Sequence, residues 1–162
     1  MYRVGTGWDA HAFGGPGPLR LGGVNVPHDR RLEGHSDGDA LVHAVCDAIL
    51  GAAGLQDIGT LFPASEPELK DVDSMKLLGR VRALAEDDGF LIVNIDSVII
   101  AQAPRLAPHI DAMRAGISAV LRLENACVGI KVKSPEGLGA VGRSEGIAAQ
   151  AVALLRKRFE KQ

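Results

Sequence analysis

GHSDGDALVHAVCDAILGAAG, residues 34–54, is the stretch that decides the fold. Ser36 stands three positions before Asp39, a spacing typical of a helix start, and Gly54 is a typical helix end. Large apolar side chains cover one side of this predicted helix, and a second stripe consists of alanines at positions 40, 44, 48 and 52. A helix that is apolar nearly all round is expected to be buried in the core.

A narrow polar line runs along this helix. Asp39, His43 and Asp47 recur at four-residue intervals and therefore share one face. They can be satisfied buried groups, because polar side chains in a core need hydrogen-bonding partners. A second interpretation comes from the N-terminal segment, where Asp9 and His11 would point to the same side of an extended chain.

Asp9, His11 and His43 are the candidate ligands of one divalent metal ion. Two imidazoles and one carboxylate suit zinc with an open fourth position, whereas magnesium and calcium prefer oxygen ligands. His35 and Ser36 stand at the start of the predicted helix, where N–H groups favour a bound phosphate; simple capping is the alternative for Ser36. Glu136 is either a ligand of a second, oxygen-coordinated metal or an exposed turn carboxylate.

The composition indicates one domain, residues 1–162, with a net charge of −2 that argues against a general nucleic-acid-binding protein. Cys46 and Cys127 lie in apolar surroundings, which favours two reduced, buried cysteines. No apolar run has the length of a membrane span, and the first residues contain no signal-peptide core. We therefore expect a cytoplasmic protein without a membrane partner.

The remaining hydrophobic patterns predict an α+β fold, a two-layer α/β sandwich in which helices cover one face of a sheet. The N-terminal strand is expected to end at Gly7 and to deliver Trp8, Asp9 and His11 at its end. The predicted strands are 2–7, 20–27 (a strand or hairpin), 90–100 and 127–133. The predicted helices are 34–54, a helix from 73 or 74 to 87, 109–121 and 144–159, and 55–67 is expected to be a loop over the site.

Several common catalytic motifs are excluded. Residues 137–142, GLGAVG, match the dinucleotide pattern G-x-G-x-x-G. We reject that reading because the predicted final helix leaves no following strand to carry an acidic ribose ligand. The sequence also lacks a phosphate-loop motif and a G-x-S-x-G nucleophile elbow. Without a recognised protein nucleophile, either water or the substrate itself must attack.

Five dispersed blocks resemble one known family. They are GWDAH (7–11), HSDGD (35–39) together with His43, DIG (57–59), AQAPR (101–105) and GRSEG (142–146). In this order, they resemble the 2-C-methyl-D-erythritol 2,4-cyclodiphosphate synthases of the non-mevalonate isoprenoid pathway. The resemblance implies cyclisation of 4-diphosphocytidyl-2-C-methyl-D-erythritol 2-phosphate with release of CMP, in which the substrate's 2-phosphate attacks its own β-phosphorus.

The resemblance also implies a role for each site residue. Asp9, His11 and His43 would bind zinc, Glu136 would bind magnesium or manganese, and His35 and Ser134 would stabilise the transition state. The expected substrate-binding residues are Ser36, Asp57, Gly59, Ala101, Pro104, Arg105, Leu106, Ala107, Lys133 and Arg143. The family resemblance further implies a homotrimer whose sheets pack around the axis and whose active sites lie between subunits.

The sequence departs from the family pattern at several positions. Ala64 stands where the family commonly has an aspartate, and Lys133–Pro135 replaces a run of threonines. Ala140 and Val141 replace larger or hydroxylated residues expected near the trimer axis. Two other functions remain open: a zinc phosphohydrolase that uses metal-bound water, and a non-catalytic trimeric module that binds cytidine nucleotides.

Overall fold

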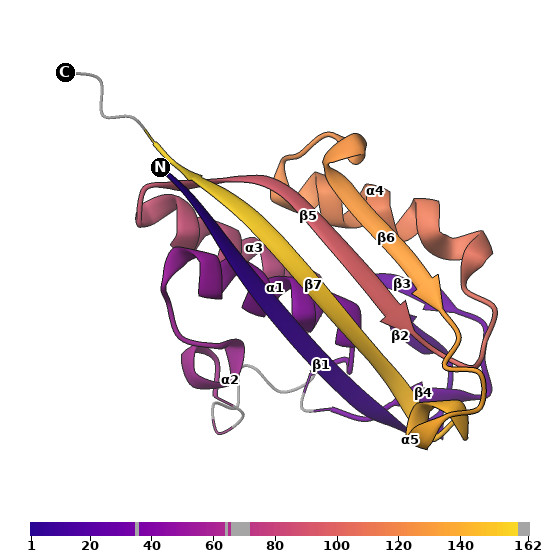
Figure 1. Ribbon diagram of the computed structural model, residues 1–162. Helices are drawn as coiled ribbons and strands as arrows, with labels where there is room; N and C mark the ends of the chain where they lie inside the picture. The colour runs from indigo at the N-terminus through magenta and orange to yellow at the C-terminus, as the bar shows by residue number, and fades with distance from the viewer. Residues whose placement is uncertain (35, 64, 66–71, 159–162) are drawn as a thin grey trace.

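The computed structural model describes residues 1–34, 36–63, 65 and 72–158. A mixed five-stranded sheet forms its centre, in the order β4-β1-β7-β5-β6 (Figure 1). These strands are β1 (Tyr2–Pro16), β4 (Arg30–Leu32), β5 (Phe90–Ile100), β6 (Val128–Lys133) and β7 (Gly146–Lys157). Only β5 and β6 run parallel; the other neighbours in this sheet are antiparallel. A separate hairpin pairs β2 (Leu19–Leu21) with β3 (Val24–Val26), so it begins one residue before the predicted segment 20–27.

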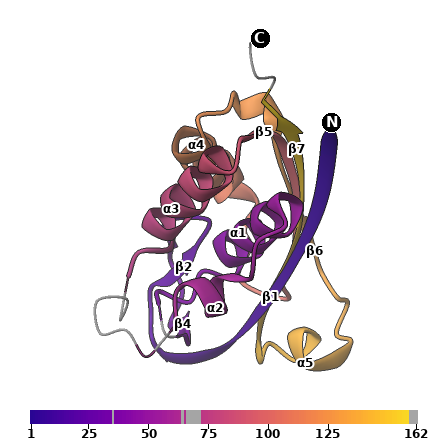
Figure 2. The same cartoon turned by 90° about the vertical axis from the view of Figure 1, so that its left-hand side faces the viewer.

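Helices cover one face of the sheet (Figure 2). The long helices are α1 (Ala40–Ala53), α3 (Ser74–Asp87) and α4 (Ile110–Leu121), and the short ones are α2 (Ile58–Leu61) and α5 (Gly139–Gly142). Two 3₁₀ turns, Ala107–His109 and Asn125–Cys127, precede α4 and β6. The predicted α+β arrangement with helices on one face is confirmed. In the described part of the chain, no helix is long and apolar enough to cross a membrane.

Helix α1 lies directly against β1 and β7, and nearly all of it is buried. Small residues on both elements allow this close approach: the alanine stripe of α1 packs against glycines of β1. A side-chain carbon placed on Gly7 would overlap the carbonyl oxygen of Ala44. The predicted end at Gly54 is correct, because this residue has a φ of 81° and closes the helix. The start is later than predicted: Asp39, not Ser36, is the N-cap, and its carboxylate accepts the N–H of Val42.

The main error of the sequence analysis is the C-terminal segment. Residues 144–159 were expected to be a helix, but Gly146–Lys157 forms β7, the middle strand of the sheet. Alanine-rich sequence favours a helix locally, while hydrogen bonding to β1 on one side and β5 on the other fixes the extended form. The exclusion of a dinucleotide site was therefore argued from a helix that does not form, since the four-residue α5 includes Gly139 and Gly142 and strand β7 follows it.

Smaller differences concern the lengths of elements. β1 continues to Pro16, because residues 2–12 pair with β7 and Phe13 and Pro16 pair with β4. Asp9 and His11 therefore lie in mid-strand and not after its end. The predicted loop 55–67 contains α2, and its positions 64, 66 and 67 lie outside the described residues. Helix α3 agrees with its prediction. Helix α4 and strand β6 each begin one residue later than predicted, and strand β4 was not predicted. Both cysteines are free, with Cys46 buried and Cys127 only half-buried.

Candidate metal centre

Strand β1 and helix α1 bring together the three residues that the sequence marked as metal ligands. Asp9 and His11 alternate along β1, and His43 belongs to the first turn of α1. Asp9 Oδ2 lies 2.8 Å from His11 Nε2 and 2.9 Å from His43 Nδ1. The two imidazole nitrogens are 3.2 Å apart. Three potential ligand atoms from distant parts of the sequence therefore converge on one point.

The hydrogen bonds around the histidines set their protonation for metal binding. His11 Nδ1 lies 2.5 Å from the carbonyl oxygen of Glu33. Because a carbonyl can only accept, Nδ1–H of His11 donates to it, so Nε2 is the nitrogen that faces the triad. His43 Nε2 lies 2.9 Å from the Ser74 hydroxyl, and that hydroxyl donates to Asp37. Nε2–H of His43 therefore donates to Ser74, and Nδ1 faces the triad. Each triad-facing nitrogen can donate a proton to the Asp9 carboxylate or, without that proton, offer its lone pair to a metal ion.

The donor set fits a tetrahedral metal ion such as zinc. Nitrogen ligands at about 2.0–2.1 Å from zinc stand about 3.3 Å from one another in a tetrahedron. The separations of 2.8, 2.9 and 3.2 Å lie slightly below that value, so a small opening of the triad would admit the ion. All three ligand atoms lie within 4.8 Å of one another. Three protein ligands would leave a fourth position for a substrate oxygen.

The charges in the triad also favour a cation. Burial alone would raise the pKa of Asp9, but hydrogen bonds from His11 and His43 outweigh burial and hold it well below its usual range. The hydrogen bond to Asp9 raises the pKa of His11, an effect that burial partly offsets. Asp9 is therefore an ionised carboxylate in this site, as a metal ligand must be.

Two residues that the sequence analysis did not assign to the site hold His43 in place. Asp37 accepts the backbone N–H of Ser74 at 3.0 Å as well as its hydroxyl, so the serine is fixed at the first position of α3. Ser36 also approaches His43, with its Oγ 2.9 Å from Nε2. Asp37 belongs to the HSDGD block, but Ser74 lies 31 residues beyond His43, and the only sequence signal there was a helix start.

The other polar members of the line on α1 have structural roles. Burial raises the pKa of Asp39, and the N–H groups of Gly23, Val42 and Gly22 oppose that rise by donating to its carboxylate. Asp47 accepts the N–H of Ile58 at 2.9 Å, which ties the start of α2 to α1. The neighbouring Asp57 caps α2 by accepting the N–H of Thr60, a bond that lowers the pKa of Asp57. Asp57 and Gly59 are thereby presented at the surface.

The remaining predicted residues form a second cluster after the ends of β5 and β6. The Gln102 side-chain oxygen accepts the N–H of Gly137 at 3.0 Å and lies 3.4 Å from Ser134 Oγ. Ser134 Oγ also accepts the N–H of Glu136, whose own backbone has a φ of 52°. Of the predicted substrate-binding residues in the segment after β5, Ala101 and Leu106 are buried, Pro104 is half-buried, and Arg105 and Ala107 are exposed.

Three further predicted residues complete the placement. Lys133 is the last residue of β6 and is exposed. Arg143 follows α5 and donates to Glu145 at 2.6 Å, which makes an exposed ion pair. His35 and Ala64 lie outside the described residues.

Comparison with known proteins identifies the family. A model of the YgbB family matches residues 2–156. The 2-C-methyl-D-erythritol 2,4-cyclodiphosphate synthase of Chromobacterium violaceum is 54% identical over 155 residues, which cover 96% of this chain and 98% of that protein. The enzyme of the same name from Thioalkalivibrio sulfidiphilus is 52% identical over 153 residues, covering 94% and 96%. The chain belongs to the YgbB family of 2-C-methyl-D-erythritol 2,4-cyclodiphosphate synthases.

Solved structures of cyclodiphosphate synthases have the same fold. The bifunctional IspDF of Campylobacter jejuni superposes with a TM-score of 0.93 at 40% identity, over 99% of this chain and 43% of that longer chain. The IspF of Plasmodium falciparum, described as a CDP complex, has a TM-score of 0.85 at 34% identity, over 98% and 97% of the two chains. The resemblance drawn from five sequence blocks is thus confirmed over nearly the whole chain.

Proposed function

We propose that this chain converts 4-diphosphocytidyl-2-C-methyl-D-erythritol 2-phosphate to 2-C-methyl-D-erythritol 2,4-cyclodiphosphate and CMP. An oxygen of the 2-phosphate attacks the β-phosphorus, a new phosphorus–oxygen bond forms, and the bond from the β-phosphorus to the bridging oxygen breaks. CMP leaves with that oxygen. The observation that carries the proposal is the Asp9–His11–His43 triad in a chain about half identical to synthases of this name.

The triad residues would hold zinc, and the bound ion would supply charge neutralisation at the β-phosphate. The tautomers set by Glu33 and Ser74 support this role, because they direct the other nitrogen of each ring at the triad, where it offers a lone pair when the ring is neutral. Ser36 lies close enough to the triad to donate to a phosphate oxygen. From the family resemblance, His35 would stabilise the transition state. Glu136 would hold magnesium or manganese with the diphosphate.

The rest of the proposed site binds the two ends of the substrate. Asp57 and Gly59, exposed on the anchored α2, would bind the methylerythritol group. The segment from Ala101 to Ala107, with Pro104, Arg105 and Leu106, would bind cytosine. Lys133 and Arg143 would add positive charge, and Ser134 would stabilise the transferring phosphoryl group. Catalysis would then consist of alignment and charge neutralisation in an intramolecular reaction.

The assembly and setting belong to the same proposal. The triad lies on β1 and α1, while Ser134, Glu136 and Gln102 form their own hydrogen-bonded group after β5 and β6. We infer a homotrimer in which the first group of one subunit faces the second group of its neighbour. Two free cysteines are consistent with a reducing, cytoplasmic setting.

The direct test is incubation of the purified protein with the proposed substrate and magnesium, read by phosphorus NMR. The expected products are the cyclic diphosphate and CMP, with loss of turnover after zinc chelation and recovery on adding zinc back. A hydrolysed, non-cyclic diphosphate would overturn the proposal in favour of a phosphohydrolase. Tight binding of CDP without turnover in any metal would favour the non-catalytic module.

His43→Ala tests the metal assignment. The variant is expected to lose stoichiometric zinc, measured by elemental analysis, and to release CMP at least about 100-fold more slowly, because a ligand and its alignment are both removed. His28→Asn is the control, since its imidazole lies outside the triad, stacked on Phe13. Unimpaired zinc content in His43→Ala would contradict the assignment.

A further inference from the structure

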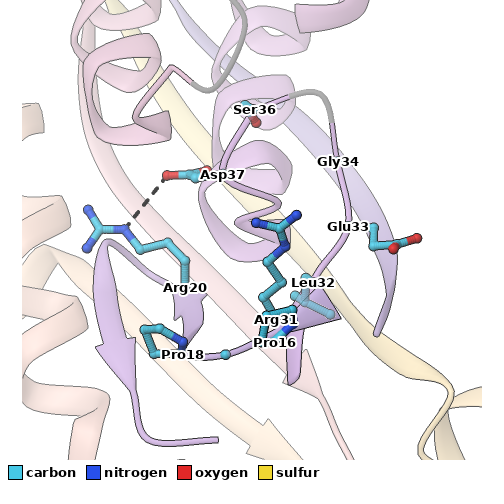
Figure 3. Close-up of a pocket in the computed structure, with 10 residues that line it drawn as sticks. Pro16, Pro18, Arg20, Arg31, Leu32, Glu33, Gly34, Ser36 and Asp37 are labelled. Carbon is cyan, nitrogen blue, oxygen red and sulfur yellow. Dashed lines mark ion pairs between the residues drawn. The ribbon is translucent and has the colours of Figure 1, made fainter. Parts of the chain in front are cut away.

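A cavity of about 470 Å³ opens beside the metal triad (Figure 3). Its walls come from the end of β1, from β2 and β4, and from the loop that leads into α1. Arg20, Arg31, Ser36 and Asp37 are the polar side chains that line it, together with Glu33. The roles assigned above use Ser36 and Asp37 from this lining but neither arginine.

The cavity shares a wall with the triad. Ser36 lines it, and Ser36 Oγ is 2.9 Å from Nε2 of His43. Gly34 also lines it, and a side-chain carbon at Gly34 would lie 3.0 Å from Cε1 of His11. A substrate held at the triad would therefore have part of its charged surface close to this cavity.

The two arginines in the cavity differ in their electrostatic surroundings. Arg20 lies 3.7 Å from Asp37 and 3.4 Å from Asp73, so its charge is already balanced. Arg31 is exposed and forms no ion pair within the described residues. In Figure 3 its guanidinium extends toward the loop between Gly34 and Asp37, whereas the Glu33 carboxylate points the other way. Among the residues that the structure describes, Arg31 is therefore a cation in this cavity without a paired carboxylate.

We propose that Arg31 binds a phosphate group of the substrate in this cavity. The inference rests on the proposed function, which supplies a substrate with a diphosphate and a separate phosphate. A guanidinium suits this task because its planar N–H groups can contact two phosphate oxygens at once. Arg31 would act in binding, outside the reacting atoms, so its loss should raise KM and leave kcat nearly unchanged.

The next residue along the chain provides a matched control. Arg30 precedes Arg31 on β4, but its guanidinium lies 4.8 Å from the ring centroid of Phe13 and donates to the carbonyl of Ser144. Arg30→Gln and Arg31→Gln therefore remove the same charge from the same strand. Only the second variant changes the cavity, so a general effect of net charge would appear in both.

The experiment measures KM and kcat for the wild type, Arg31→Gln, Arg31→Lys and Arg30→Gln, and binding of inorganic pyrophosphate by calorimetry. Removing one charge-assisted contact at an exposed site is expected to raise KM about 5- to 30-fold and to weaken pyrophosphate binding similarly. Arg31→Lys should recover part of the lost affinity, because lysine retains the positive charge but lacks the planar N–H groups that contact two oxygens at once. Arg30→Gln should match the wild type in both measurements.

The two readouts separate this inference from the proposed function. If the wild type cyclises the substrate but Arg31→Gln and Arg30→Gln give equal KM values, the inference is wrong. If the wild type shows no turnover but Arg31→Gln alone loses pyrophosphate affinity, the anion site stands and the proposed function falls. A fall in kcat with unchanged KM would also contradict the binding role.

Discussion

At the scale of single residues, Ser74 determines how His43 meets a metal ion. Its hydroxyl donates to Asp37 and accepts from His43 Nε2, which leaves Nδ1 free for the ion. Ser74→Ala should lower zinc affinity about 10- to 100-fold, the usual effect of losing a ligand's supporting hydrogen bond. Competition with a chromophoric chelator measures this. The control is Ser118→Ala, which removes the buried hydroxyl of a different serine, on α4, and should bind zinc normally. Equal affinities in the two variants would show that Ser74 does not support the ligand.

The residue scale also explains which parts of the candidate site could be predicted. Asp9 and His11 alternate, and His43 shares a helix face with two aspartates, so local periodicity was enough to select all three. Ser74 was not selected, because its role arises only when α3 packs beside α1. Asp47 shares the helix face of His43, but its carboxylate accepts the N–H of Ile58. Sequence spacing identifies ligands within an element, whereas their supports come from other elements.

At the scale of elements, the packing of α1 on β1 fixes the distance between His43 and the β1 ligands. Gly7 leaves no space for a side chain, because an added carbon would overlap the backbone oxygen of Ala44. Gly7→Ala should therefore destabilise the fold by about 2–3 kcal/mol, as overpacking against unyielding backbone does. Chemical denaturation followed by circular dichroism measures the change.

A second glycine in the same interface gives the opposite expectation. At Gly51 on α1, an added carbon would lie 3.9 Å from the carbonyl oxygen of Thr6 and 4.0 Å from Cα of Gly5, which are ordinary contact distances. Gly51→Ala should stabilise the protein by about 0.5–1 kcal/mol, because alanine loses less backbone entropy in a helix. If Gly7→Ala were as stable as Gly51→Ala, the close packing of α1 on β1 would be disproved.

The element scale is also where sequence reasoning failed most clearly. Helix α1 was identified because its pattern, its terminal glycine and its burial all agree. The segment Gly146–Lys157 was misread because runs of alanine and leucine suit a helix in isolation. Its exposed positions, Gln150 and Val152, in fact alternate with buried alanines, as in a strand. Pairing on both sides, which local propensity cannot reveal, decides this element.

At the scale of the whole molecule, the face of the sheet opposite the helices suggests how the chain assembles. Val4 and Trp8 on β1 are 68% and 64% exposed, and Val152 on β7 is 41% exposed. Helices cover the other face of this sheet (Figure 2). Gly5 and Gly7 of β1 face α1, so the alternation along the strand places Val4 and Trp8 on the helix-free face, and Val152 is paired with Thr6 on that same face. Apolar groups gathered on an uncovered sheet face are typical of a subunit interface.

The proposed trimer is tested by placing a charge on this face. Val4→Glu should shift the mass in light scattering from three times the 17.0 kDa chain toward the monomer, because a buried carboxylate in an apolar interface is costly. Leu84→Glu adds the same charge on α3, in the helical layer, and should remain trimeric. Since the triad and the Ser134–Glu136 cluster would meet only between subunits, cyclisation should fall together with assembly in Val4→Glu, while each monomer keeps its zinc ligands. A monomeric Val4→Glu variant with full turnover would show that one chain holds a complete site, and would overturn the shared active site.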